Sequence, residues 1–155
     1  MSFQIRGLPA SDFAPLFSLP DQELASRGAV RMVVDRNPGF PCRISLRDAA
    51  VGETVLLLNF EHLAVASPYR SRHAIFVSRN AAEAQLDLNE IPESLRIRLL
   101  SLRAFDEAGM MLDADVVQGL ELAAAIHRML DRDATAYLHV HNAKRGCFAA
   151  RVDRT

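Results

Sequence analysis

The chain lacks the residues that usually build a nucleic-acid or membrane surface. Its 155 residues include no tryptophan and two tyrosines, and Lys144 is its only lysine. Nucleic-acid-binding surfaces typically combine a basic stripe with interleaved aromatic side chains. A formal net charge of −1 provides no general attraction to nucleic acid or to anionic lipid. We therefore expect neither nucleic acid nor membrane as a partner.

The chain also lacks long apolar runs and has little cysteine. No apolar run approaches the ~20 residues that a membrane-spanning helix needs. Residues 1–7 show no positive region followed by an apolar core, which a secretory signal would require. The two cysteines of a chain without an export signal are expected to be reduced. These features predict a cytoplasmic protein.

Several common catalytic motifs are missing. The sequence contains no Gly-x-Gly-x-x-Gly, Walker A or Gly-x-Ser-x-Gly pattern, which argues against nucleotide hydrolysis by those routes. It contains no Cys-x-x-Cys and no His-Glu-x-x-His, which argues against thioredoxin-type disulfide exchange and a zincin protease. Any active site must therefore be sought in less familiar arrangements.

The patterns that are present predict an α+β fold. A chain of this length with 50% hydrophobic residues suits one core, so we expect a single domain over residues 1–155. Capping and periodicity predict short helices at 11–17, 21–27 and 92–98 and a longer one at 120–130. Strands are predicted at 29–35, 42–46, 54–60, 73–78, 100–105 and 110–117. This order indicates a mainly antiparallel sheet with helices packed on it and a C-terminal β-hairpin.

The C-terminal hairpin carries the most chemistry. Side chains alternate along a strand, so His139 and His141 share the face opposite Leu138 and Val140. Matching the apolar rows of the two strands places Val140 opposite Phe148 and Leu138 opposite Ala150. This register predicts that His141 lies opposite Cys147, with residues 142–146 as the loop.

Three interpretations of this face remain open. An imidazole beside a thiol can favour the thiolate, so Cys147, His141 and His139 form a candidate catalytic site. Alternatively, His139 and His141 could bind a divalent metal with Cys147 as a third ligand and His73 or His62 as a further one. The third interpretation is a set of ordinary polar residues on a half-solvated sheet, with Cys147 as a small hydrophobic residue.

Further candidates lie at the ends of the predicted central strands. The strand at 54–60, apolar on both faces, ends in polar residues, and loops at such ends often hold functional sites. Glu61, His62, Arg70 and His73 could converge there, or form an ordinary solvated loop. The residues that we expect to bind a ligand, with guanidinium groups suited to anions, are Arg43, Arg70, His73, Tyr69 and Asn142. By contrast, Cys42 shares an apolar row with Ile44 and Leu46, which indicates a buried structural thiol.

Three segments together carry a family resemblance. They are Pro41-Cys42-Arg43-Ile44-Ser45-Leu46, Ser67-Pro68-Tyr69-Arg70 followed by Ile75-Phe76-Val77, and His139-Val140-His141-Asn142-Ala143 followed by Gly146-Cys147. With these segments the chain resembles, over nearly its whole length, the bacterial proteins grouped as domain-of-unknown-function family 1203. The resemblance implies a stand-alone bacterial cytosolic domain and assigns no catalytic role to any residue.

Two functional hypotheses follow. The first is a small-molecule enzyme that uses Cys147 or a histidine-bound metal, with His141 as base and Arg43 or Arg70 holding an anionic group. The second is a non-catalytic domain that binds a ligand or a protein through the same face. The expected partner is a small anionic molecule, while the sequence identifies no cofactor and leaves the oligomeric state open.

Overall fold

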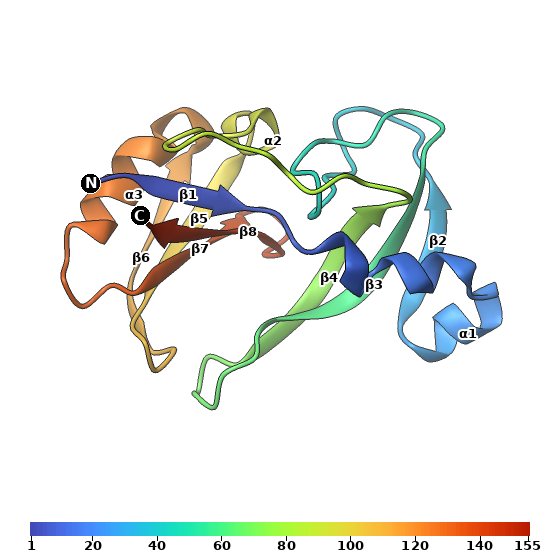
Figure 1. Cartoon of the computed structure of the whole chain (residues 1–155), viewed down its shortest axis with the longest axis horizontal. Coiled ribbons are helices and arrows are strands. Elements are labelled where there is room, and N and C mark those ends of the chain that lie inside the picture. The colour runs from blue at the N-terminus through green and yellow to red at the C-terminus, as the bar shows by residue number, and fades with distance from the viewer.

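Two antiparallel sheets stand side by side in the computed structural model of the chain, which describes residues 1–155 (Figure 1). The larger sheet has the strand order β1-β8-β7-β5-β6, and the smaller one has the order β2-β3-β4. The strands are β1 (Phe3–Arg6), β2 (Ala29–Val33), β3 (Thr54–Leu63), β4 (Ser71–Ser78), β5 (Leu99–Phe105), β6 (Met111–Gln118), β7 (Tyr137–Asn142) and β8 (Phe148–Arg154). The helices are α1 (Asp21–Ser26), α2 (Glu93–Arg96) and α3 (Leu122–Leu130), and Ala10–Asp12, Ala14–Ser18 and Gly119–Glu121 form 3₁₀ turns. The predicted α+β class with a C-terminal hairpin is thus confirmed.

The larger sheet buries one face against α3. The stripe Leu122, Ile126, Met129 and Leu130 follows helical spacing, and all four side chains are buried. They pack in one core with the inward-facing residues of the strands, which include Leu100, Leu102, Leu138, Val140 and Val152. The opposite face of this sheet is therefore free to meet the smaller sheet. None of the helices has the length and apolar character that crossing a membrane requires.

The smaller sheet is centred on β3, as the apolar run predicted. Val55, Leu56 and Leu58 are buried on it. Leu56 and Leu58 pack with Phe13 and with Leu24 of α1, whereas Val55 belongs to a separate hydrophobic cluster. A strand covered on both sides needs apolar residues at successive positions. The position of β3 also fixes where its polar end, Asn59 to His62, emerges.

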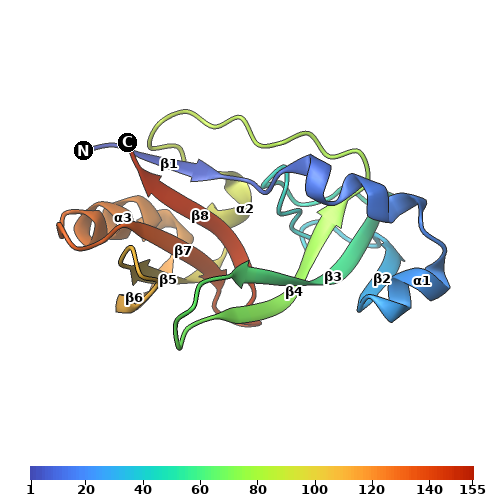
Figure 2. The same cartoon turned by 60° about the horizontal axis from the view of Figure 1, so that its bottom comes forward.

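The two sheets meet where the β3–β4 hairpin lies beside the β7–β8 hairpin (Figure 2). The ring of Phe60 on β3 lies 6.1 Å from the ring of Phe148 on β8, measured between centroids. Behind this contact, residues 79–92 run from β4 on the smaller sheet to α2 beside the larger one (Figure 1). The interface between the sheets is the part of the fold that positions the candidate site.

Some predicted elements differ in the structure. Residues 42–46 form a turn closed by the N–H of Leu46 donating to the carbonyl of Cys42 (3.0 Å), and not a strand. Apolar residues at every second position suit such a turn as well as a strand, and Cys42 is buried as expected. The segment at 11–17 consists of 3₁₀ turns, and Ser11 caps neither of them. Strand β1 was not predicted, because four residues carry too little periodicity.

The predicted register of the C-terminal hairpin is wrong. Val140 pairs with Ala150 and His141 with Phe148, because a β-bulge at Ala149 inserts an extra residue into β8. The bulge turns Phe148 to the histidine face, where the parity argument had placed Cys147. The N–H of Asn142 donates to the carbonyl of Cys147. Cys147 therefore lies opposite Asn142 in the hairpin, on the face of the sheet away from His141. The shared face of His139 and His141 is confirmed.

We predict that Gly7→Ala destabilises the fold at the crossing between β1 and the turn at 42–46. A Cβ at Gly7 would lie 2.1 Å from the carbonyl oxygen of Ile44, and backbone cannot move aside cheaply. Overpacking of this kind costs about 1–3 kcal/mol, which thermal unfolding should register as a Tm loss of roughly 2–4 °C per kcal/mol. Gly39→Ala is the control, because its Cβ would meet only the flexible Arg36 side chain. Equal Tm values for the two variants would contradict this account.

Candidate metal centre

Three imidazoles from the two sheets converge at the interface. His139 and His141 lie on β7 of the larger sheet, and His62 lies on β3 of the smaller one. One ring nitrogen from each residue lies within 4.8 Å of the other two. His62 is distant in sequence from the other two, so tertiary packing completes this cluster.

Local backbone geometry explains why the side chains meet. His139 and His141 are two residues apart on β7 and therefore project from the same face of the sheet. On β3 the pairing with β4 is interrupted between Phe60 and Leu63. Such an irregularity re-aims side chains, and here His62 faces the β7–β8 hairpin. Its ring centroid lies 4.9 Å from that of His141 and 6.0 Å from that of His139.

Phe148 forms the wall behind the cluster. The His62 ring stacks on the Phe148 ring at 5.5 Å with an interplanar angle of 7°. His139 and His141 approach the same ring edge-on, at 5.0 Å and 5.9 Å. One phenyl ring thus contacts all three imidazoles and limits their rotation.

Burial keeps the three imidazoles neutral. His139 and His141 are 2% and 1% exposed, and His62 is half-buried. Burial, assisted by neighbouring positive groups, lowers the pKa of His139 to about 3. Burial also lowers the pKa of His141 to about 3, although the hydrogen bond that its ring donates to the carbonyl of Gly146 acts in the opposite direction. Burial together with the charge of Arg103 lowers the pKa of His62 to about 4. The neutral imidazole is the form that ligates metal ions.

One buried nitrogen on each ring has no hydrogen-bond partner. These atoms are His62 Nδ1, His139 Nδ1 and His141 Nε2. For His141 the tautomer follows from the other nitrogen, because Nδ1 lies 3.0 Å from the carbonyl oxygen of Gly146, which can only accept a hydrogen bond. Nδ1 therefore carries the proton, and Nε2 presents a lone pair. A carbonyl that fixes the tautomer in this way is the usual outer partner of a metal-binding histidine.

Arg103 borders the cluster from the neighbouring strand β5. It pairs directly with His139 across the β5–β7 ladder. Its Nε donates to Ser101 Oγ at 3.3 Å, and no carboxylate lies within salt-bridge distance of it. Partial burial lowers the pKa of Arg103 below its ordinary value, although a guanidinium stays charged in proteins. Arg103 was not predicted as a site residue, because nothing in the pattern of β5 sets it apart.

Arg43 and Cys147 form a second buried group, behind the hairpin. Arg43 is 2% exposed and donates from Nε to the carbonyl of Phe148 at 2.7 Å and from Nη2 to Cys147 Sγ at 3.1 Å. Its Nη1 donates to the carbonyl of Pro41. Burial lowers the pKa of Arg43, which proximity to Cys147 partly offsets. The Cys147 thiol thus bonds a guanidinium and not an imidazole, so the expected thiol–imidazole contact with His141 is corrected.

The remaining sequence-predicted residues are spread around these groups. Asn142 donates from Nδ2 to Cys147 Sγ at 3.4 Å. Arg70 pairs with Glu61 on the exposed side of the β3–β4 hairpin. His73 pairs with Phe60 across that hairpin and lies close enough to His62 and His141 to influence their charge. Tyr69 is 38% exposed, and its ring lies 6.3 Å from that of Phe105.

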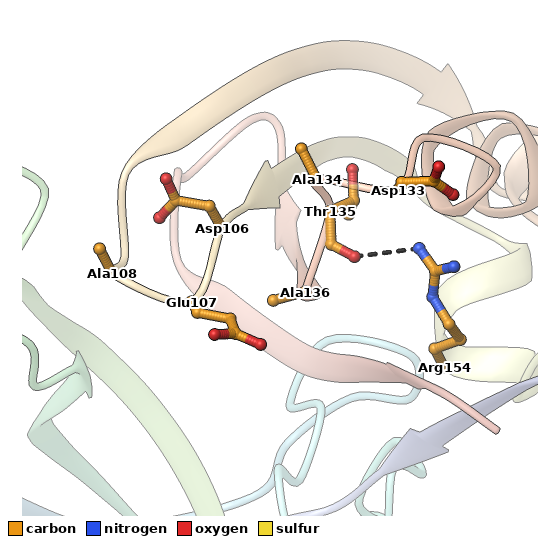
Figure 3. Close-up of a pocket in the computed structure, with 8 residues that line it drawn as sticks. All are labelled: Asp106, Glu107, Ala108, Asp133, Ala134, Thr135, Ala136 and Arg154. Carbon is orange, nitrogen blue, oxygen red and sulfur yellow. Dashed lines mark hydrogen bonds between the residues drawn. The ribbon is translucent and has the colours of Figure 1, made fainter.

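A surface hollow of about 700 Å³ is separate from the histidine cluster (Figure 3). Its lining includes Asp106, Glu107, Asp133 and Arg154 but no histidine or cysteine. Arg154 donates to the carbonyl of Thr135, as the dashed line in Figure 3 shows, and also to those of Leu130 and Arg132. Its guanidinium therefore binds three carbonyls of the segment 130–135, which assigns it a structural role.

Comparison with known protein families identifies one match. Residues 39–154 match the model of a family described as protein of unknown function (DUF1203). The match covers most of the chain, which therefore belongs to that family. It includes Arg43, Arg103 and all three histidines of the cluster. No curated protein and no solved structure matches the chain.

We predict that Arg43→Met lowers the free energy of unfolding by about 2–4 kcal/mol, because the buried carbonyl of Phe148 and the partly buried carbonyl of Pro41 lose a charged donor. Urea denaturation measures the loss. Arg47→Met is the matched control, since Arg47 is exposed and its side chain makes no hydrogen bond or ion pair, so its effect should stay within about 0.5 kcal/mol. Similar values for both variants would show that the Arg43 contacts contribute little.

We also predict that acid destabilises the metal-free protein. The pKa of His139 in the folded state, about 3, lies below the ordinary value of 6.5. Between these values the unfolded chain binds more protons than the folded chain, so the free energy of unfolding decreases as the pH falls below about 6.5. Above that pH the stabilisation from the neutral imidazole is complete. Urea denaturation with chelator at about pH 7 and about pH 5 measures the slope. His139→Gln should flatten it, and an unchanged slope would argue against a neutral buried imidazole.

Proposed function

We propose that this member of the DUF1203 family binds a divalent transition metal, with zinc as the best fit, through His62, His139 and His141, and uses it for chemistry on a small molecule. The observation that carries the proposal is the convergence of three ring nitrogens within 4.8 Å across the sheet interface. The three buried nitrogens without partners support it, because buried polar atoms are nearly always satisfied. A metal ion is a partner that such imidazole nitrogens can bind.

The donor set and its geometry fit zinc. Imidazole nitrogen bonds zinc at about 2.0–2.1 Å, so tetrahedral ligands lie about 3.4 Å apart. The nitrogens here lie within 4.8 Å and must therefore close by up to about 1.5 Å around the ion. His62 is half-buried at an irregularity in β3, and a small shift of this strand end can supply the closure. Copper and nickel also accept imidazole ligands and rank as competitors.

The number of ligands favours an active rather than a purely structural metal. Structural zinc sites are usually closed by four protein ligands, whereas catalytic sites hold three and leave a position for water or substrate. When bound, such a metal lowers the pKa of its water to about 7 and polarises a carbonyl oxygen. Phe148 provides an apolar wall beside the centre, and the carbonyl of Gly146 fixes the tautomer of His141. Small-molecule hydrolysis or hydration is the reaction type that this arrangement supports.

A cytoplasmic location is part of the proposal. Both cysteines are free thiols, and each is engaged in a hydrogen bond, Cys42 with the N–H of Ser78 and Cys147 with Arg43. Reduced cysteines are typical of the cytoplasm. The bacterial origin that the family resemblance implies remains an expectation.

We predict that the metal-free protein binds about one equivalent of Zn²⁺ or Co²⁺, as a three-ligand site requires. Elemental analysis gives the stoichiometry, and the visible spectrum of Co²⁺ reports nitrogen ligation. Excess Zn²⁺ at about 100 times its Kd should stabilise the fold by ~2.7 kcal/mol, a Tm rise of roughly 5–10 °C for a domain of this size.

His62→Gln tests the site with the least damage to the fold, because His62 is only half-buried. This variant should keep the metal-free Tm within a few degrees and lose the Zn²⁺-induced rise. His73→Gln is the matched control: it removes a neighbouring imidazole that pairs with Phe60 and does not belong to the cluster. Absence of Zn²⁺ and Co²⁺ binding in the wild type, or equal binding in His62→Gln, would refute the proposal.

A further inference from the structure

We propose that Arg103 binds the carboxylate of a small organic anion at the open side of the histidine centre. This inference rests on the proposed function, because it assigns the class of molecule that the metal would hold. Arg103 pairs with His139 across β5 and β7, and its charge acts on all three imidazoles of the cluster. A guanidinium in this position can hold one end of a ligand whose other end reaches the centre.

Burial indicates where the centre opens. His139 and His141 are almost fully buried, whereas His62 and Arg103 are each partly exposed. Among these four residues, His62 and Arg103 thus form the side of the centre that lies nearest to solvent.

Arg103 is unpaired while its acidic neighbours are paired. On the adjacent strand β6, Asp115 forms an ion pair with Arg128 of α3. Asp113 forms one with Arg132, which follows α3. Both pairs lie on the other face of the sheet. Glu61 on β3 and Asp153 on β8 have their own arginines as well, in the pairs Arg70–Glu61 and Arg151–Asp153. Nε of Arg103 reaches only a hydroxyl, so both terminal nitrogens are left to bind an anion. A partly desolvated guanidinium without a counter-charge is suited to a planar, bidentate carboxylate.

Apolar side chains beside Arg103 favour an organic anion over an inorganic one. Ala114 pairs with Arg103 across β5 and β6, and Val116 pairs with Ser101, so both lie on the face that carries Arg103. Val116 is 59% exposed, and Ala114 is exposed too. The edge strand thus presents an apolar ledge next to the charge. A carboxylate with a short hydrocarbon tail matches both features.

The experiment titrates the Co²⁺-loaded protein with propionate and, in a second arm, with inorganic phosphate, and follows the visible Co²⁺ spectrum. Propionate should change the spectrum at lower concentration than phosphate. In Arg103→Gln the propionate Kd should rise about tenfold or more, as loss of a charge-assisted hydrogen bond implies, while the Co²⁺ affinity changes less than about threefold. Arg72→Gln is the matched control, because Arg72 is exposed on β4 and bonds Asn59 and Glu61. It should leave the propionate Kd within about twofold of the wild-type value.

The outcomes separate the two proposals. If Co²⁺ does not bind, both the metal centre and the anion site are refuted. If Co²⁺ binds but propionate leaves the spectrum unchanged, or if Arg103→Gln binds propionate as the wild type does, only the anion site is refuted. Tighter binding of phosphate than of propionate overturns the choice of an organic carboxylate. A Val116→Ser variant that weakens propionate more than formate supports the role of the apolar ledge.

Discussion

The hydrogen bond from Arg43 to the carbonyl of Phe148 is the contact on which the interface depends. It ties the turn at 42–46 to the first residue of β8 in the interior, where a guanidinium must be matched by acceptors. The same residue, Phe148, turns its ring to the other side, against all three imidazoles. One buried cation thus holds the hairpin in the position that the candidate centre requires.

Burial has opposite consequences for the two kinds of nitrogen base at this interface. The imidazoles become neutral, because desolvation moves their pKa values far below 7. Arg43 and Arg103 cannot respond in this way and keep their charge. Arg43 donates hydrogen bonds to two carbonyls and a thiol. Arg103 lies at the edge of the interface and donates to a single hydroxyl. A site with neutral metal ligands beside an unpaired cation suits an anionic ligand.

Periodicity predicted much of the fold and half of the candidate site. The apolar stripe of α3, the central position of β3 and the shared face of His139 and His141 all follow from the spacing of side chains. The bulge at Ala149 could not be predicted, because inserting one residue reverses parity without leaving a mark on composition. That single residue moved Phe148 to the histidine face and Cys147 away from it.

The amino-acid sequence by itself determined most of the elements, the buried stripe of α3 and the pair of imidazoles on β7, because these depend on neighbours within a few residues. Only the tertiary structure decided that two separate sheets form, that His62 joins the pair and that Arg103 rather than Arg70 stands beside it. These facts depend on which strand ends meet. Strand order and inter-sheet packing arise from contacts between residues far apart in the chain, and local periodicity carries no information about them.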